Sequence, residues 1–201
     1  MRNSFKEYYG LNSSELDKLW KEGIIVFDTN VLLSLYRRSQ GVRDDFISMI
    51  KSLSDRIWIP YQVGYEFHEH RLEEAMRPIE AVRAIKGKLQ KFENDFEQEY
   101  GNNPYLDNKK IKIAFKAFSS KLDKMIQESL TSCPEFLKED RVLTVLTELF
   151  DGKTGPDYQE KMLTEIYMLG SERYSNKIPP GYKDAKKHEG DRHRFGDLII
   201  W

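Results

Sequence analysis

The chain has 201 residues, of which 32% are charged and 12% aromatic, a composition typical of a folded globular protein and not of a disordered one. Its formal net charge of −1 gives no overall attraction to nucleic acid, so any such binding requires a local basic patch. The single cysteine, Cys133, excludes an internal disulfide, and no apolar run has membrane-spanning length or the features of a signal peptide. We therefore expect one cytoplasmic domain with no membrane partner.

The first predicted strand lies at residues 24–27, where the run Ile-Ile-Val-Phe is apolar and strand-favouring. This strand leads directly into Asp28, and a helical pattern of apolar residues follows at once. Open α/β sheets bind ligands at the carboxyl ends of their strands, which makes Asp28 a candidate functional residue. On this pattern alone, Asp28, Thr29 or Asn30 could equally serve only as the N-terminal cap of the helix.

The second predicted strand is Ile57-Trp58-Ile59, which Pro60 ends. The following helix carries Glu66 in its first turns, at the border of a buried face, because aromatic residues flank it on both sides. Glu66 is therefore the second candidate acid.

A long helical stretch follows, with separate helices predicted over residues 62–100, 109–130, 139–150 and 156–174. Pro78 predicts a kink or a break in the first of them. The stretch is too long for one crossover between strands, so we expect a helical insertion at about residues 75–175. Strands alternating with helices predict an α/β class with a short, mostly parallel sheet flanked by helices.

The segment from residue 177 to residue 194 is strongly basic, with six basic and three acidic residues. Directly after it, Asp197 opens an apolar helical pattern, where it is either a third functional acid or an N-terminal cap. Three acids at strand ends or helix starts are the kind of ligands that Mg²⁺ requires, because this ion takes a few oxygen ligands and keeps waters for its substrate.

Three segments carry a resemblance to a known family. Residues 24–33, Ile-Ile-Val-Phe-Asp-Thr-Asn-Val-Leu-Leu, resemble the opening motif of PIN-domain nucleases. The strand, proline and helix at residues 57–66 resemble the second motif of that family, with Glu66 as its glutamate. Residues 179–184 and 196–201 resemble the third-acid region of a large bacterial PIN-like branch, which carries long helical insertions.

The resemblance implies a single PIN-like domain over residues 1–201, in which Asp28, Glu66 and Asp197 are catalytic and bind Mg²⁺ or Mn²⁺. It implies that Thr29 and Asn30 orient these ligands. The residues expected to bind the nucleic-acid backbone are Lys183, Lys186, Lys187, Arg192 and Arg194.

The expected activity is that of a metal-dependent endoribonuclease, and the family resemblance suggests a toxin or phage-defence role. A protein partner such as an antitoxin, and a homo-oligomer, belong to the same expectation. Two alternatives stay open: a structure-specific DNA nuclease, since metal ligands do not contact the sugar, and a non-catalytic PIN-like interaction module.

PIN domains usually supply a fourth acid on a later strand, and this chain ends in an apolar run before such a motif. We therefore expect a fragment that lacks a C-terminal strand and helix. Asp184 or Asp191 could replace the fourth acid, although acids beside so many lysines more often only balance charge.

Overall fold

The computed structural model describes residues 1, 4–5, 8–131, 139–186 and 190–200. The chain forms two compact units. The first comprises Met1–Leu32, Arg38–Glu69 and Leu143–Trp201, and the second comprises Leu33–Arg37 and His70–Val142. The predicted insertion at about 75–175 overlaps the second unit only as far as Val142, because the helices that follow belong to the first unit. Two residues singled out in the sequence, Cys133 and Lys187, lie outside the described residues.

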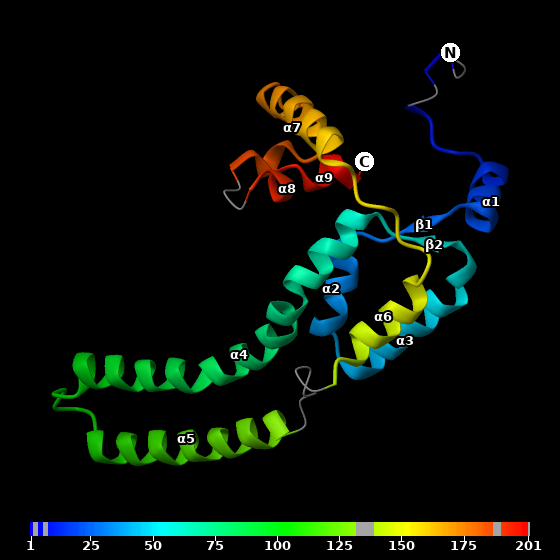
Figure 1. Ribbon diagram of the computed structural model, residues 1–201. Coiled ribbons are helices and arrows are strands. Elements are labelled where there is room, and N and C mark those ends of the chain that lie inside the picture. Colours follow the sequence, from blue (N-terminus) through cyan, green and yellow to red (C-terminus); the bar gives the residue numbers. More distant parts are fainter. Residues whose placement is uncertain (2–3, 6–7, 132–138, 187–189, 201) are drawn as a thin grey trace. The chain divides into compact units, whose positions relative to one another are not determined.

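The sheet of the first unit is parallel and very short. Strand β1 (Ile25–Val26) pairs with β2 (Ile57–Trp58), with Ile25 opposite Ile57 (Figure 1). A parallel bridge joins Ile59 to Thr154, and the Ile59 amide donates to the Lys153 carbonyl at 3.1 Å. The prediction of parallel strands is confirmed. Each strand is only two residues long, so the described chain is mainly helical.

Helices surround this sheet. The amino-terminal half contributes α1 (Ser13–Glu22), α2 (Thr29–Arg37), α3 (Gln40–Ser52) and the 3-10 helix η2 (Ser54–Arg56). Phe27, directly after β1, is buried and makes edge contacts with Phe46 of α3 at 6.5 Å and with Phe150 of α6 (Arg141–Phe150) at 6.2 Å. This aromatic contact between distant segments fixes the end of β1, where Asp28 follows.

The carboxyl-terminal helices of the first unit gather around one aromatic side chain. They are α7 (Glu160–Ser175), η3 (Tyr182–Lys186), α8 (Asp191–Arg194) and α9 (Gly196–Ile200). Phe195, between α8 and α9, is 1% exposed, and its ring lies 5.7 Å from that of Tyr167 and 5.0 Å from that of Tyr174. Gly170 permits this packing, because a Cβ there would lie 2.5 Å from the Phe195 ring. The core contact holds the α9 start in place.

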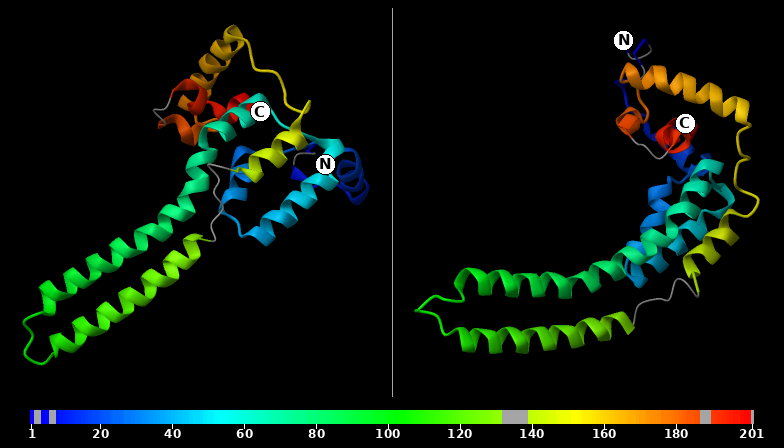
Figure 2. Two further views of the ribbon diagram at one scale, coloured as in Figure 1. Left: turned by 60° about the horizontal axis from the view of Figure 1, so that its bottom comes forward. Right: turned by 60° about the vertical axis from the view of Figure 1, so that its left-hand side comes forward.

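The longest helix, α4 (Tyr61–Tyr100), belongs to the first unit up to Glu69 and to the second from His70. The helix continues through Pro78, so it does not break there. In the second unit, α4 and α5 (Asn108–Thr131) run antiparallel, side by side (Figures 1 and 2). Their seam includes Phe92 and Phe96, whose rings lie 5.8 and 5.7 Å from that of Phe115.

In the second unit, a polar network joins α2, α4 and the residue that precedes α6. Asp140 accepts hydrogen bonds from the Tyr36 hydroxyl at 2.8 Å and from Arg71 at 2.9 Å. Burial, and then the hydrogen bond to Asp140, raise the pKa of Tyr36 above its ordinary range.

Among the described residues, no helix combines the length and the apolar character that a membrane span requires.

Candidate active site

Asp28 occupies the N-cap position of α2, but its side chain makes no capping hydrogen bond to the described residues. The carboxylate is exposed and accepts a long hydrogen bond of 3.3 Å from the side-chain amide of Asn30. A cap residue normally accepts a hydrogen bond from a backbone N–H of the first helical turn. The Asp28 carboxylate is therefore available for another role, and Asn30 lies where it can orient that group.

Glu66 lies in the second turn of α4, with a half-buried side chain. Its Oε2 accepts a hydrogen bond of 2.7 Å from the Thr29 hydroxyl, and its Oε1 accepts one of 2.8 Å from the Gln62 side-chain amide. Thr29 is 4% exposed and Gln62 is 1% exposed, so both donors are fixed by their surroundings. These two bonds hold the carboxylate in one orientation, and each oxygen keeps a second lone pair.

Asp197 is exposed in the first turn of α9, and its neighbour Gly196 lies against Glu66. A Cβ at position 196 would lie 2.7 Å from Glu66 Oε1, so only glycine allows this approach. On the other side, a Cβ at Gly181 would lie 2.9 Å from the Asp197 Cβ. The turn at residues 179–181 and the start of α9 are thus packed together.

The hydroxyl of Tyr174, a residue of α7, lies near Asp197, because both approach Gly181. Its side chain is 5% exposed, and its hydroxyl has no hydrogen-bond partner among the described residues. Burial, followed by the charges of Asp197 and Asp184, raises the pKa of the Tyr174 hydroxyl. The charges of Asp184 and Asp197 thus both act on the Tyr174 hydroxyl. Of the two acids considered as a fourth ligand, only Asp184 has a described side chain.

Glu66 connects the segments that carry the other two predicted acids. Thr29, directly after Asp28, donates a hydrogen bond to Glu66, and Gly196, directly before Asp197, packs against it. Among the described residues of the first unit, no three histidine, cysteine, aspartate or glutamate side chains have ligand atoms within 4.8 Å of one another. The segments that carry the three carboxylates are therefore adjacent, but the carboxylate oxygens do not converge on one point.

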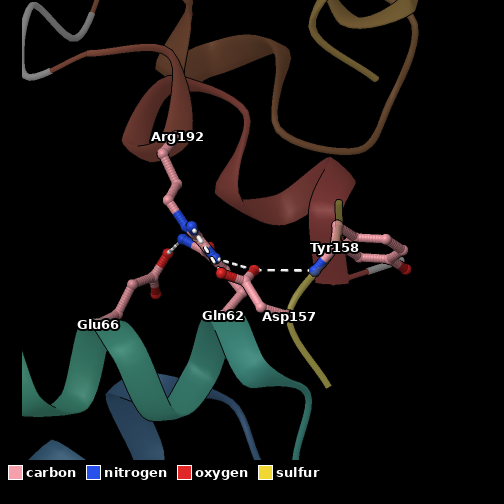
Figure 3. Close-up of polar contacts among 5 residues, drawn as sticks. All are labelled: Gln62, Glu66, Asp157, Tyr158 and Arg192. Carbon is pink, nitrogen blue, oxygen red and sulfur yellow. Dashed lines mark hydrogen bonds and ion pairs between the residues drawn. The ribbon is translucent and has the colours of Figure 1, made fainter. Parts of the chain in front are cut away.

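Arg192 belongs to α8, and its side chain extends toward the first turns of α4, as Figure 3 shows. Its Nε donates to Gln62 Oε1 at 2.8 Å, and its two terminal nitrogens donate to Asp157 at 2.6 and 3.3 Å. The guanidinium also covers the rings of Tyr61 and Tyr65, with distances of 5.3 and 4.7 Å to their centroids. The hydrogen bond to Asp157 raises the pKa of Arg192, so its charge is permanent. These contacts turn the guanidinium toward the protein.

The other basic residues predicted to bind nucleic acid differ in exposure. Lys183 and Lys186 of η3 are exposed, whereas Arg194 is half-buried with its guanidinium 5.0 Å from the centre of the Phe195 ring. Both lysines belong to η3, and Gly181, directly before this element, packs against Asp197. Two of the predicted phosphate contacts therefore lie in the part of the fold that carries the third acid.

A cavity of about 530 Å³ lies elsewhere in the first unit. Its lining comes mainly from α4 and α6 and is mostly apolar, with Tyr61, Tyr65, Leu146 and Phe150 among the residues that contribute. None of the three predicted acids lines it. The candidate site, with two exposed aspartates and a half-buried glutamate, is thus separate from this cavity.

Two site residues were not predicted from the sequence. Gln62 is four residues before Glu66 on the same helix, a spacing that places side chains on one face and could have identified it. Asp157 carries no such signal, because its contact with Arg192 joins residues 35 positions apart.

Comparison with known proteins gave one match. A family model described as PIN like domain matches residues 24–201, which is most of the chain. No curated protein and no solved structure matches.

Proposed function

Because the chain belongs to the PIN-like domain family, we propose that it is a metal-dependent nuclease that cleaves RNA, with Asp28, Glu66 and Asp197 binding Mg²⁺ or Mn²⁺. The observation that supports this proposal most strongly is the position of Glu66. Its carboxylate accepts a hydrogen bond from Thr29, next to Asp28, and packs against Gly196, next to Asp197. Three acids that are distant in the sequence thus belong to one region of the fold.

The donor atoms suit a hard divalent cation. All three side chains offer carboxylate oxygens, which are the ligands that Mg²⁺ and Mn²⁺ prefer. The Asp28 side chain makes no capping hydrogen bond to the described residues, both aspartates are exposed, and Gly196 adds no side chain of its own against Glu66 Oε1. When bound, the metal would supply an activated water and offset charge on the attacked phosphate.

The side chains around the three acids would orient the carboxylates and bind the nucleic-acid backbone. Thr29 and Gln62 fix the Glu66 carboxylate, and Asn30 restrains that of Asp28. Lys183 and Lys186 are exposed cations that can hold the sugar-phosphate backbone beside Asp197. DNA is the rival substrate, because carboxylates and lysines address phosphate and only a 2′-OH contact distinguishes RNA.

A cleavage assay on RNA and DNA oligonucleotides of the same sequence tests the proposal. With Mn²⁺, the parent protein cleaves RNA, and chelation by EDTA stops cleavage. Changing a residue that only supports a metal ligand costs about 10- to 100-fold, so loss of a ligand in Glu66→Gln is expected to cost at least about 100-fold. Glu73→Gln is the matched control, because Glu73 is an exposed acid on the same helix that pairs with Arg77.

Three results would count against the proposal. Cleavage that persists in EDTA excludes the metal, and full activity of Glu66→Gln excludes this site. Cleavage of DNA alone assigns the chain to the rival DNA nuclease.

A further inference from the structure

We infer that Arg192 is a positioning residue that acts through Gln62 to fix the orientation of the Glu66 carboxylate, and that Asp157 holds Arg192 in place for this task. The inference rests on the proposed function, in which Glu66 is a metal ligand. It replaces the expectation that Arg192 binds the nucleic-acid backbone. The four side chains form one line of hydrogen bonds, which Figure 3 shows from Asp157 through Arg192 and Gln62 to Glu66.

The orientation of the Gln62 amide is determined because this amide lies between a donor, Arg192 Nε–H, and an acceptor, the Glu66 carboxylate. Arg192 Nε–H can only donate, so it must face the carbonyl oxygen of the Gln62 amide. The ionised Glu66 carboxylate can only accept, so it must face the NH₂ group of that amide. Rotating the amide by half a turn would place donor against donor and acceptor against acceptor. Arg192 therefore determines that Gln62 presents a donor to Glu66.

Burial makes this dependence strong. Gln62 is 1% exposed, so water cannot readily replace a lost partner of its amide. The Arg192 side chain is 21% exposed and is enclosed by the carboxylate of Asp157 and the rings of Tyr61 and Tyr65. A guanidinium that packs against two aromatic rings and makes a two-pronged carboxylate contact has little freedom to rotate. The fixed donor at Nε follows from this enclosure.

The same contacts oppose a role in binding phosphate. A nucleic-acid phosphate would have to displace Asp157 from the two terminal nitrogens of Arg192, which it contacts at 2.6 and 3.3 Å. The exposed Lys183 and Lys186 require no such exchange. Arg192 is thus better suited to support Glu66 than to bind the substrate directly.

Four variants separate this relay from a general structural role. Arg192→Lys keeps the positive charge but lacks the planar fork, and Gln62→Met removes the amide at similar volume. The third variant combines both changes, and the fourth, Asp157→Asn, loosens Arg192 without touching Gln62. Arg83→Lys, an exposed exchange on the part of α4 that belongs to the second unit, is the matched control.

Two readouts test the variants. The NMR signal and hydrogen exchange of the Gln62 side-chain amide, recorded without metal, apply to the variants that keep Gln62, and the dissociation constant of Mn²⁺ applies to all of them. Arg192→Lys and Asp157→Asn should shift the amide signal and speed its exchange, whereas Arg83→Lys should leave both unchanged. Arg192→Lys and Gln62→Met should each weaken Mn²⁺ binding by about 10-fold, the usual lower cost of losing a supporting contact. Because Arg192 acts through Gln62, the double variant should also lose about 10-fold and not the product of about 100-fold.

An unchanged Gln62 amide in both Arg192→Lys and Asp157→Asn overturns the inference, and so do multiplicative losses of Mn²⁺ affinity in the double variant. If the parent protein binds no Mn²⁺ but the Gln62 amide signal shifts in Arg192→Lys and Asp157→Asn, the metal site is overturned instead, and the coupling of Arg192 to Gln62 stands. Asp157→Asn keeps the test decisive if Arg192→Lys does not fold, which circular dichroism would show.

Discussion

Thr29 connects the first predicted acid to the second. Its buried hydroxyl donates to Glu66 Oε2 at 2.7 Å, so the residue after Asp28 restrains the second acid directly. Sequence reasoning identified Thr29 as a cap or an orienting residue. The spacing of 37 residues to Glu66 gave no indication of this partner.

Thr29→Val is therefore expected to be destabilising although it keeps the shape of the side chain. A hydrogen bond to a charged group contributes about 1.5–3 kcal/mol, and partial exposure of Glu66 lowers this to about 1 kcal/mol. Urea unfolding of Thr29→Val should show that loss, whereas Thr29→Ser, which keeps the hydroxyl, should lose less. Equal stability of the valine and serine variants would mean that this bond contributes nothing.

Tyr36 predicts a change of stability with pH in the alkaline range. Burial and Asp140 raise its pKa in the folded protein, while in the unfolded chain it ionises near the ordinary value of about 10. Above that value the unfolded state loses the proton first, so the free energy of unfolding falls as the pH rises toward the folded pKa. Below about pH 9 this residue contributes little pH dependence.

Tyr36→Phe should remove this alkaline fall. One group with an unfolded pKa of about 10 accounts for a loss of about 1.4 kcal/mol between pH 9 and pH 11. Urea unfolding of the parent and the variant over that range isolates the effect, because every other tyrosine is common to both. Parallel curves for the two proteins would contradict the assignment.

At the scale of elements, local patterns predicted the helices well and their ends less well. The helix predicted from residue 156 begins at Glu160, because Pro156 and the residues after it, including Asp157, lie in an irregular segment. The strands were predicted in the correct places, and their parallel pairing followed from the alternation of strands and helices. Their short length was not predictable, since it depends on pairing between segments far apart in the sequence.

The basic element η3 gives a prediction on binding. Each phosphate neutralised on single-stranded RNA contributes about −0.7 to the slope of log affinity against log salt. The triple variant Lys183→Ala, Lys186→Ala and Lys187→Ala should therefore flatten the slope by up to about 2 relative to the parent. The control removes the same charge from α5 of the second unit, through Lys109→Ala, Lys116→Ala and Lys121→Ala. Equal slopes for the parent and the first variant would mean that these three lysines do not contact the nucleic acid.

At the scale of the whole molecule, the sequence predicted three acids as candidate ligands but gave no sign of the contacts that hold Glu66. Asp28, Glu66 and Asp197 were indicated by strand ends, a helix start and the resemblance to a family to which the chain belongs. The line from Asp157 to Glu66 depends on α8 and the segment before α7 meeting the start of α4. No local pattern encodes such a meeting, so Arg192 was interpreted from its charge alone.

The most direct test of the central claim is a crystal structure of the protein grown with Mn²⁺, in which anomalous scattering locates the metal. The account predicts one peak bound by carboxylate oxygens of Asp28, Glu66 and Asp197 at about 2.2 Å, with Gln62 still donating to Glu66. Metal binding would then draw the two exposed aspartates toward the fixed glutamate. A peak held by other residues, or no peak at a saturating Mn²⁺ concentration, would contradict the account.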